Sequence, residues 1–219
     1  MQRLFWIVVF VFLVPLTFGQ TLRQSKHNQT NVGNYTIMLR SPSKKTRSLA
    51  IQKIKAVGKS ALPYLEKSLH SSNLYECNGA ATILSQMGRD AIPLLSATLK
   101  DQDVYVRTIS VWALGAITDE PRMVLPLLKS ALKDSNSQVR TSAVFALGGT
   151  LKEPNTIFPA LISVLQDRDY NVRQSAIYFL YVRGKQSMPF LIQATKSNDV
   201  LISEGAKVAI ERYNAPRQK

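Results

Sequence analysis

The chain has 219 residues, of which 45% are hydrophobic and 8% aromatic, and a formal net charge of +14. This apolar content is enough for one extended domain with a continuous core, which argues against disorder of the whole chain. Glycine and proline number ten each, without the period or enrichment of a collagen-like or low-complexity sequence.

The N-terminal segment, MQRLFWIVVFVFLVPLTFGQ, has the pattern of a secretory signal peptide. After Arg3, residues 4–16 form a run of thirteen apolar residues, which is shorter than the roughly 20 that a membrane-spanning helix needs. Pro15 and small residues follow, as in a cleavage region. We therefore expect residues 1–19 to be a signal peptide and the protein to be exported, periplasmic or secreted. An uncleaved segment would instead anchor it.

Residues 20–43 are rich in Asn, Gln, Ser and Thr and are predicted to be a flexible, basic, polar linker. The charge is concentrated in this part of the chain: residues 21–60 contain nine basic and no acidic residues, whereas residues 61–180 sum to zero. Such a segment suits contact with an anionic polymer or lipid, and the alternative is a solvated tail. Because the central part of the chain is neutral, the net charge does not favour nucleic acid as a partner.

Beyond the linker, the sequence repeats. A proline recurs at nearly constant intervals, slightly longer in the middle of the chain than at its ends, at Pro63, Pro93, Pro126, Pro159 and Pro189. Each begins an apolar pattern of helical period, and we expect it in the first turn of a helix, where proline is tolerated. Upstream polar residues are the candidate N-caps of these helices, namely Ser60, Asp90, Asn155 and Ser187.

A second helix is predicted in every repeat. At one fixed offset after each proline stands a side chain able to cap a helix, in the series Asn73, Asp103, Asn136, Asp169 and Asp199. Apolar or small residues then recur at i, i+4, i+7 and i+8, as in Val106, Ser110, Ala113 and Leu114. The same stripe returns as Val139, Ala143, Ala146 and Leu147, and as Val172, Ala176, Phe179 and Leu180.

These segments resemble the HEAT-like repeats of the phycobilisome-lyase type, whose pattern is an Asp followed by V-R-x-x-A-x-x-A-L-G. The matching residues include Asp101 with Val106-Arg107 and Ala113-Leu114-Gly115, and the match fades toward both ends of residues 44–213. The resemblance implies an all-α fold, a right-handed α-solenoid of about five HEAT-like helix pairs. An N-terminal half repeat at residues 45–57 would precede these pairs, and residues 214–219 would form a polar tail.

The recurring acidic and basic residues are interpreted as structural. Because they return at the same position of consecutive repeats, they predict a ladder that ties turns to helices. Its members are Asp101, Arg107, Asp134, Arg140, Asp167 and Arg173.

The sequence offers little for catalysis. The two histidines, His27 and His70, have no spacing typical of a metal site or a catalytic dyad, and no phosphate-binding loop is present. Cys77, the single cysteine, is expected to be a small buried side chain. We therefore expect no metal, no cofactor and no small-molecule substrate, and a protein that is not an enzyme. A lyase-type accessory subunit is the least favoured alternative.

The candidate binding residues lie on the second helices, which usually line the concave side of a solenoid. Trp112, Phe145 and Tyr178 occupy the same repeat position and would form an aromatic row for a protein or peptide. The alternative is that these rings pack in the core. Flanking and extending candidates are Thr108, Thr141, Gln174, Tyr105, Tyr181 and Arg183. The favoured function is thus an exported protein-binding scaffold, and the alternative is an electrostatic binder of anionic polymer or lipid through residues 21–60.

Overall fold

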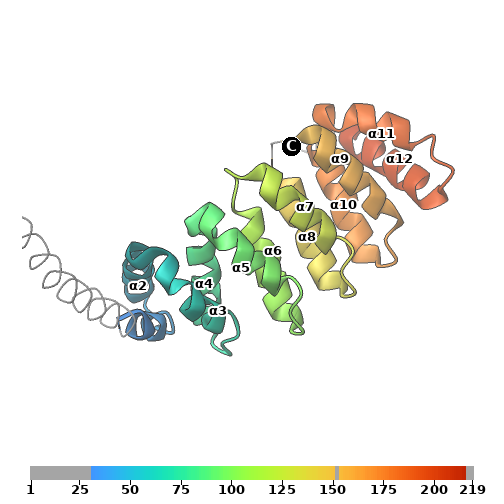
Figure 1. Ribbon diagram of the computed structural model, residues 1–219. Coiled ribbons are helices and arrows are strands. Elements are labelled where there is room, and N and C mark those ends of the chain that lie inside the picture. Colours follow the sequence, from blue (N-terminus) through green and yellow to red (C-terminus); the bar gives the residue numbers. More distant parts are fainter. Residues whose placement is uncertain (1–30, 151–152, 216–219) are drawn as a thin grey trace, which may run out of the picture. The chain divides into compact units, whose positions relative to one another are not determined.

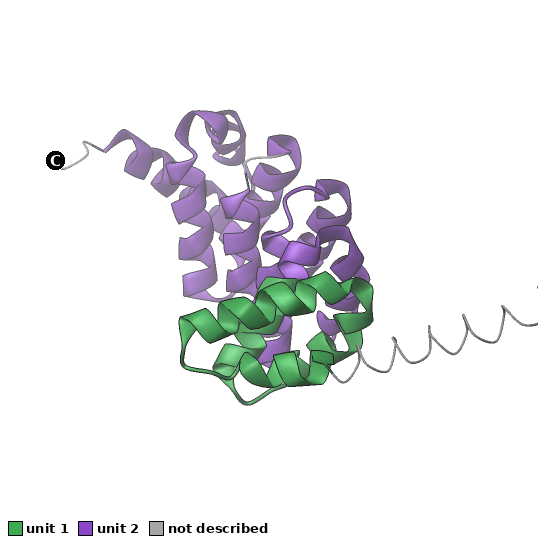
Figure 2. Ribbon diagram, turned by 90° about the vertical axis from the view of Figure 1, so that its left-hand side faces the viewer, with its two compact units in different colours: residues 1–83 green, residues 84–219 purple. Residues whose placement is uncertain are grey.

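The computed structural model describes residues 31–150 and 153–215, which are helical with short connections and contain no strand. The all-α fold class is therefore confirmed for the described part of the chain. The expected signal peptide, residues 1–19, lies outside the described residues. The chain forms two compact units, residues 1–83 and residues 84–219 (Figure 2).

The described helices follow one another in pairs (Figure 1). In chain order they are residues 31–38, α2 (Lys44–Val57), α3 (Leu62–Leu69), α4 (Leu74–Met87), α5 (Ile92–Thr98), α6 (Val104–Gly115), α7 (Pro121–Ala131), α8 (Ser137–Gly149), α9 (Pro154–Ser163), α10 (Tyr170–Val182), α11 (Met188–Ala194) and α12 (Val200–Asn214).

The second helix of each predicted repeat begins where the sequence places it. Asp103 Oδ1 accepts a hydrogen bond from the N–H of Tyr105 at 2.8 Å, and Asn136 Oδ1 accepts one from Gln138 at 2.8 Å. The corresponding residues of the other repeats, Asn73, Asp169 and Asp199, cap α4, α10 and α12 in the same way. These caps satisfy backbone donors that the first turn of a helix leaves without a partner.

The first helices differ from the prediction at their starts. Three of them follow a glycine with positive φ and a short 3-10 turn, at Gly58, Gly88 and Gly184. The proposed side-chain caps of these helices are wrong, because the 3-10 turn leads directly into the helix and no side chain caps it.

In the two central repeats the recurring proline lies deeper in the first helix, and the intervals between the prolines are longer there. The helices α7 and α9 start one turn earlier, at Pro121 and Pro154, so that Pro126 and Pro159 lie inside them and not in the first turn. Asn155 is accordingly a residue of α9 and not its N-cap.

The first unit contains a helix where the sequence analysis predicts a flexible linker. Residues 31–38 are helical, and Val32 and Leu39 are fully buried. Thr36 lies between them in the sequence and is also buried, so that the three residues form a buried stripe at i, i+4 and i+7. The methyl groups of Leu39 lie against Gly79 of α4, where an added Cβ would meet them at 3.1 Å. The linker prediction is therefore wrong for residues 31–39.

The helix of residues 31–38 and α2 form a complete pair, so the predicted half repeat is also wrong. Ser43 caps α2, and Arg47 Nη1 donates hydrogen bonds to the carbonyl oxygens of Ser41 at 2.7 Å and Pro42 at 2.8 Å. Arg107 makes the same two bonds to the turn before α6. The repeat domain thus begins before residue 44.

In the second unit, the helices form two layers (Figure 1). The second helices α6, α8, α10 and α12 pack side by side in chain order, and the first helices cover them on one side. Gly115 and Gly148 permit the close approach: a Cβ on Gly115 would lie 2.6 Å from the Cβ of Ala146, and one on Gly148 would lie 2.2 Å from Cγ of Phe179. The predicted stripe is buried between the layers, with Ala146 and Phe179 half-buried.

Candidate functional site

The aromatic row, defined as Trp112, Phe145 and Tyr178, is exposed on three consecutive second helices. The rings belong to α6, α8 and α10, and their exposed fractions are 65%, 50% and 45%. On each helix the row lies away from the buried stripe, so the first helices do not cover it. Of the two alternatives that the sequence leaves open, surface and core, the structure shows the surface.

Aromatic contacts fix the row at its α8 and α10 end. Phe179 contacts Phe145 edge-on with 5.1 Å between ring centroids, and it contacts Tyr178 at 5.2 Å. Tyr178 in turn contacts Tyr181 at 5.5 Å. Such edge-to-face pairs restrict ring orientation and add a modest stabilisation. The apolar pattern predicts only a core position for Phe179, and the structure shows that its ring also holds the row.

The residues that flank the row are polar and half-buried. Thr108 donates to the carbonyl of Val104 within its own helix at 2.7 Å. Gln174 Oε1 accepts a hydrogen bond from Arg212 of α12 at 2.9 Å. Thr141 occupies the same repeat position on α8, the helix between theirs, and Tyr105 is exposed near the start of α6. The expected set is therefore brought to one side of the second helices.

Arg183 is an exception, because the structure gives it a partner within the fold. Its Nη2 and Nε donate to the carbonyl oxygen of Gly148 at 2.6 and 3.1 Å. That carbonyl is near the C-terminal end of α8, where carbonyls lack an intrahelical donor and a cation is favourable. Arg183 thus joins α10 to α8 and does not extend the binding face.

Four residues of the predicted ladder form ion pairs between repeats. Arg107 Nε and Nη2 donate to Asp134 at 2.8 and 3.0 Å, and Arg140 Nε and Nη2 donate to Asp167 at 2.7 and 2.8 Å. Each pair links a second helix to the turn of the following repeat. Because the second helices carry the aromatic row, the ladder also holds the spacing of its rings.

The electrostatics of the ladder favour the ionised carboxylates. Burial acts to raise the pKa of the Asp134 and Asp167 carboxyls, but the arginine partner and a backbone N–H outweigh it, so that both pKa values lie below the usual range. Hydrogen bonding to these carboxylates raises the pKa of Arg107 and Arg140. The two pairs therefore stay charged at neutral pH.

The ladder ends at Arg173. Its Nη1 donates to the carbonyls of Asp167 and Arg168 at 2.7 and 3.2 Å, as its counterparts do, but a carboxylate partner is absent among the described residues. In the next repeat Ser197 replaces the aspartate. At the other end of the ladder, Asp101 Oδ1 accepts a hydrogen bond from the N–H of Asp103 at 2.8 Å.

In the first unit a different ion pair joins the helices. Glu76 is 5% exposed and accepts hydrogen bonds from Arg40 at 2.6 Å, Ser71 at 2.6 Å and Ser68 at 2.9 Å. Burial raises its pKa, but these hydrogen bonds and the charge of Arg40 outweigh burial, so that the pKa of Glu76 is lowered. Cys77 beside it is fully buried, as expected.

Over residues 31–150 and 153–215, no group of three or more His, Cys, Asp or Glu side chains could hold a metal ion. In the same part of the chain, no helix has the length and apolar character to cross a membrane. His70 lies near the end of α3, with Nδ1 3.0 Å from the carbonyl oxygen of Glu66, and His27 is outside the described residues.

Comparison with known proteins agrees with this architecture. The family model for HEAT repeats matches residues 78–148 and 124–211. No curated protein sequence matches the chain. The structure of the complex of CpcE and CpcF of phycocyanin lyase from Nostoc sp. PCC7120 is similar, with 26% identity and a TM-score of 0.50 over 68% of this chain and 98% of that chain.

Two further structures are similar to this one. Cex1p is 14% identical with a TM-score of 0.53, over 84% of this chain and 43% of that chain. A designed armadillo repeat protein in complex with the peptide (KR)4 is 17% identical with a TM-score of 0.45, over 84% of this chain and 99% of that chain. With the HEAT model matching more than half of its length, the chain belongs to the HEAT repeat family.

Proposed function

We propose that this protein is a binding module, without catalytic activity of its own, that holds an extended segment of a partner protein across α6, α8 and α10. The observation that carries the proposal is the exposure of Trp112, Phe145 and Tyr178 at one repeat position. Large aromatic side chains dominate the binding energy of protein interfaces. A row of three on a rigid surface supplies such anchors at a fixed interval.

The chemistry of the surrounding face favours a partner of low charge. Apart from the ladder arginines, α6, α8 and α10 contain no charged residue. The exposed or half-exposed neighbours of the row carry hydroxyl and amide groups, at Thr108, Gln138, Thr141, Asn171 and Gln174. Such groups donate to and accept from a peptide backbone, whereas an anionic polymer would find no cation in the row itself.

The interval between the rings favours a particular backbone conformation in the partner. Packed helices lie about 8–10 Å apart, and small residues at the contact place them toward the lower limit. The contacts at Gly115 and Gly148 are of this kind. A polyproline II segment returns to the same face every three residues, or about 9.3 Å, and such segments dock on aromatic surfaces. The partner segment is therefore proposed to be proline-rich and uncharged.

A binding assay with matched variants tests this function. The probe is a fluorescently labelled, uncharged proline-rich peptide of about ten residues, long enough for three helices, and the readout is fluorescence anisotropy. The variant Trp112→Ala/Phe145→Ala/Tyr178→Ala is expected to lose binding while retaining its helical circular dichroism. The control Tyr75→Ala/Tyr170→Ala removes two exposed rings outside the row and is expected to bind normally. Equal binding by all three proteins would contradict the proposal.

One observation favours a second candidate, the electrostatic binding of an anionic polymer or lipid. Residues 31–83 contain eight basic and two acidic residues, and one of these acids, Glu76, is buried and paired. Lys44 and Lys45 lie in the first turn of α2, where positive charge opposes the helix dipole. An anion bound there would relieve this repulsion.

Neutralisation of the lysines tests this candidate better than deletion, because residues 31–57 are a packed repeat. Binding to vesicles of anionic phospholipid should fall steeply with salt. It should be lost when Lys44, Lys45, Lys53 and Lys55 are changed to Gln. Binding that is unchanged by these substitutions would exclude α2 as the contact.

The structural likeness to the CpcE and CpcF complex favours one further alternative, an accessory subunit of a lyase. The carboxyl groups with a lowered pKa in the described residues are Glu76, Asp134 and Asp167, each bound to an arginine. Aromatic-row substitutions that abolish a lyase reaction of a partner, without changing peptide affinity, would favour this role over simple binding.

Export is proposed from the sequence of residues 1–19 alone. The measurement is the N-terminal sequence of the mature protein, taken from the cell envelope or the medium by mass spectrometry. A start near residue 20 is expected. A protein retained in the cytoplasm with its first residues intact would contradict export.

A further inference from the structure

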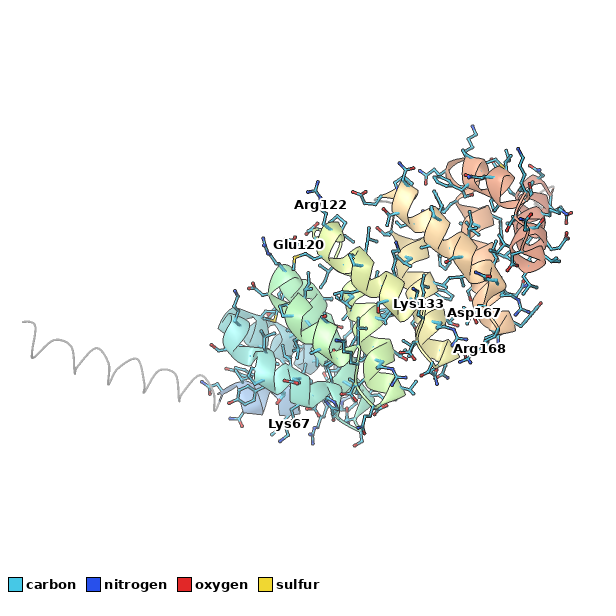
Figure 3. All side chains as sticks on the ribbon, turned by 45° about the vertical axis from the view of Figure 1, so that its right-hand side comes forward. Lys67, Glu120, Arg122, Lys133, Asp167 and Arg168 are labelled. Atoms are coloured by element: carbon cyan, nitrogen blue, oxygen red, sulfur yellow. The ribbon has the colours of Figure 1, made fainter. Side chains whose placement is uncertain are left out.

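A cleft of about 920 Å³ opens between α7 and α9, in the layer of first helices. It therefore lies on helices other than those that carry the aromatic row. One wall consists of α7 and the turn after it, and the other consists of α9 and the turn after it. Figure 3 labels Arg122 and Lys133 near the two ends of the first wall and Asp167 at the second.

The cleft exists because the facing residues are too small to fill the space between the helices. Pro126 and Ser130 of α7 face Ala160 and Ser163 of α9. The next pair of first helices shows the contrast: Phe158 of α9 contacts Phe190 of α11 with 5.3 Å between ring centroids. Without such a ring pair, α7 and α9 leave an open channel along their length.

The α7 wall is basic. Arg122 and Lys129 are seven residues apart, which places them on one side of α7, and Lys133 follows in the turn after the helix. All three are exposed, and none of them forms an ion pair or a side-chain hydrogen bond among the described residues. The cations are therefore available to a ligand.

The opposite wall and the floor add hydroxyl groups and apolar surface. Thr156 and Ser163 of α9 supply hydroxyls, and Leu125, Leu132 and Val164 supply apolar contacts. The lining carboxylate of Asp167 is already neutralised by Arg140 at 2.7 Å. Glu153 is the other acidic residue of the lining, and it offsets one of the three cations. The cleft therefore carries a surplus of two positive charges.

We propose that this cleft binds an extended acidic peptide segment of a partner protein. At 1.5 Å per residue, Arg122 and Lys129 lie about 10 Å apart along α7, and Lys133 lies beyond the end of the helix at Ala131. An extended chain rises about 3.3 Å per residue. Acidic residues at positions j and j+3 of the segment therefore match Arg122 and Lys129, and a third at j+5 extends toward Lys133, with apolar side chains between them on the floor.

The dimensions and the lining distinguish this ligand from other anions. The volume greatly exceeds that of a small inorganic anion and is in the range of pockets for larger ligands. Single-stranded nucleic acid is bound by stacking of bases on aromatic rings, and the lining of this cleft contains no aromatic residue. An acidic peptide with apolar residues uses both the cations and the floor.

The test uses the full chain and a labelled ten-residue peptide with Asp at positions j, j+3 and j+5 and Leu between them. Fluorescence anisotropy at low salt is expected to show binding. The variant Arg122→Gln/Lys129→Gln/Lys133→Gln is expected to weaken it roughly tenfold or more, since each exposed pair contributes a factor of up to about five. The charge-matched control Lys100→Gln/Lys185→Gln/Lys196→Gln changes three exposed lysines outside the cleft and should bind like the parent, and Glu153→Gln about twofold more tightly.

Three results would overturn the proposal. The first is that the parent protein does not bind the acidic peptide at low salt. The second is that both triple variants lose affinity equally, which would show attraction to net charge alone. The third is that a labelled single-stranded oligonucleotide binds with dependence on the three cations and the acidic peptide does not compete with it, so that the cleft takes a different anion.

Discussion

Arg107 and Asp134 form a two-point clamp between consecutive repeats. Two nitrogens of the guanidinium group hold the two carboxylate oxygens at 2.8 and 3.0 Å, and the third nitrogen, Nη1, donates to the turn before its own helix at 2.8 Å. One side chain therefore joins a turn, a helix and the next turn. Arg140 and Asp167 form the same arrangement one repeat further along the chain, so the clamp is a unit of the repeat.

Removal of a clamp should destabilise the second unit. Arg140 is only 4% exposed, and its replacement by Gln leaves the Asp167 carboxylate without its cation. We expect the free energy of unfolding to fall by about 2–3 kcal/mol. Urea titration followed by circular dichroism measures this quantity.

The chain provides a matched control for this substitution. Arg173 occupies the same repeat position and bonds the same carbonyls, but it has no carboxylate partner among the described residues. Arg173→Gln should therefore cost less than about 1 kcal/mol. Equal losses for the two variants would show that the carboxylate pairing contributes nothing.

Acid should weaken the fold through the paired carboxylates. The pKa values of Asp134, Asp167 and Glu76 are lowered in the folded state. Their contribution to stability is complete above the unfolded pKa of about 4 and is lost as the pH falls through the lower folded values. We expect the free energy of unfolding to decline below about pH 4. The decline should be shallower in Asp134→Asn/Asp167→Asn. An identical pH profile for this variant would contradict the assignment.

Two neighbouring glycines of α8 test the close packing of the second helices. A Cβ at Gly148 would lie 2.2 Å from Cγ of Phe179, whereas one at Gly149 would meet nothing within 4 Å. Gly148→Ala should destabilise the protein by about 1–3 kcal/mol through overpacking. Gly149→Ala should be neutral or stabilise it by up to about 1 kcal/mol, since Ala favours helix. Thermal unfolding of both variants measures the difference, and similar effects would argue against tight contact at Gly148.

The helix pairs of the central repeats could be predicted because their signals are local and recur. A capping side chain, a stripe of apolar residues and an Asp and Arg at fixed offsets each report on a few neighbouring residues. The first repeat was hidden because Ser41 replaces the aspartate and the segment around it is polar. Its helix is stabilised by burial of Val32 and Leu39, which sequence composition alone does not reveal.

Parts of the candidate site depend on contacts between repeats and were less predictable. The exposure of Trp112 follows from its place on the helix, but the edge-on contact of Phe145 with Phe179 requires the actual spacing of α8 and α10. Arg183 looked available, yet it caps a carbonyl of another helix. The cleft between α7 and α9 arises from an absence of large side chains, and no motif marks it.

Site-specific photo-crosslinking tests whether the proline-rich peptide lies across α6, α8 and α10. A benzophenone amino acid placed at position 112, 145 or 178 retains an aromatic ring, and the crosslinked residue of the bound proline-rich peptide can be identified by mass spectrometry. Binding across the second helices predicts crosslinks to three different peptide residues that advance by about three from one helix to the next. Crosslinks to a single peptide residue, or none above those from an exposed position outside the row such as Tyr170, would contradict binding across the second helices.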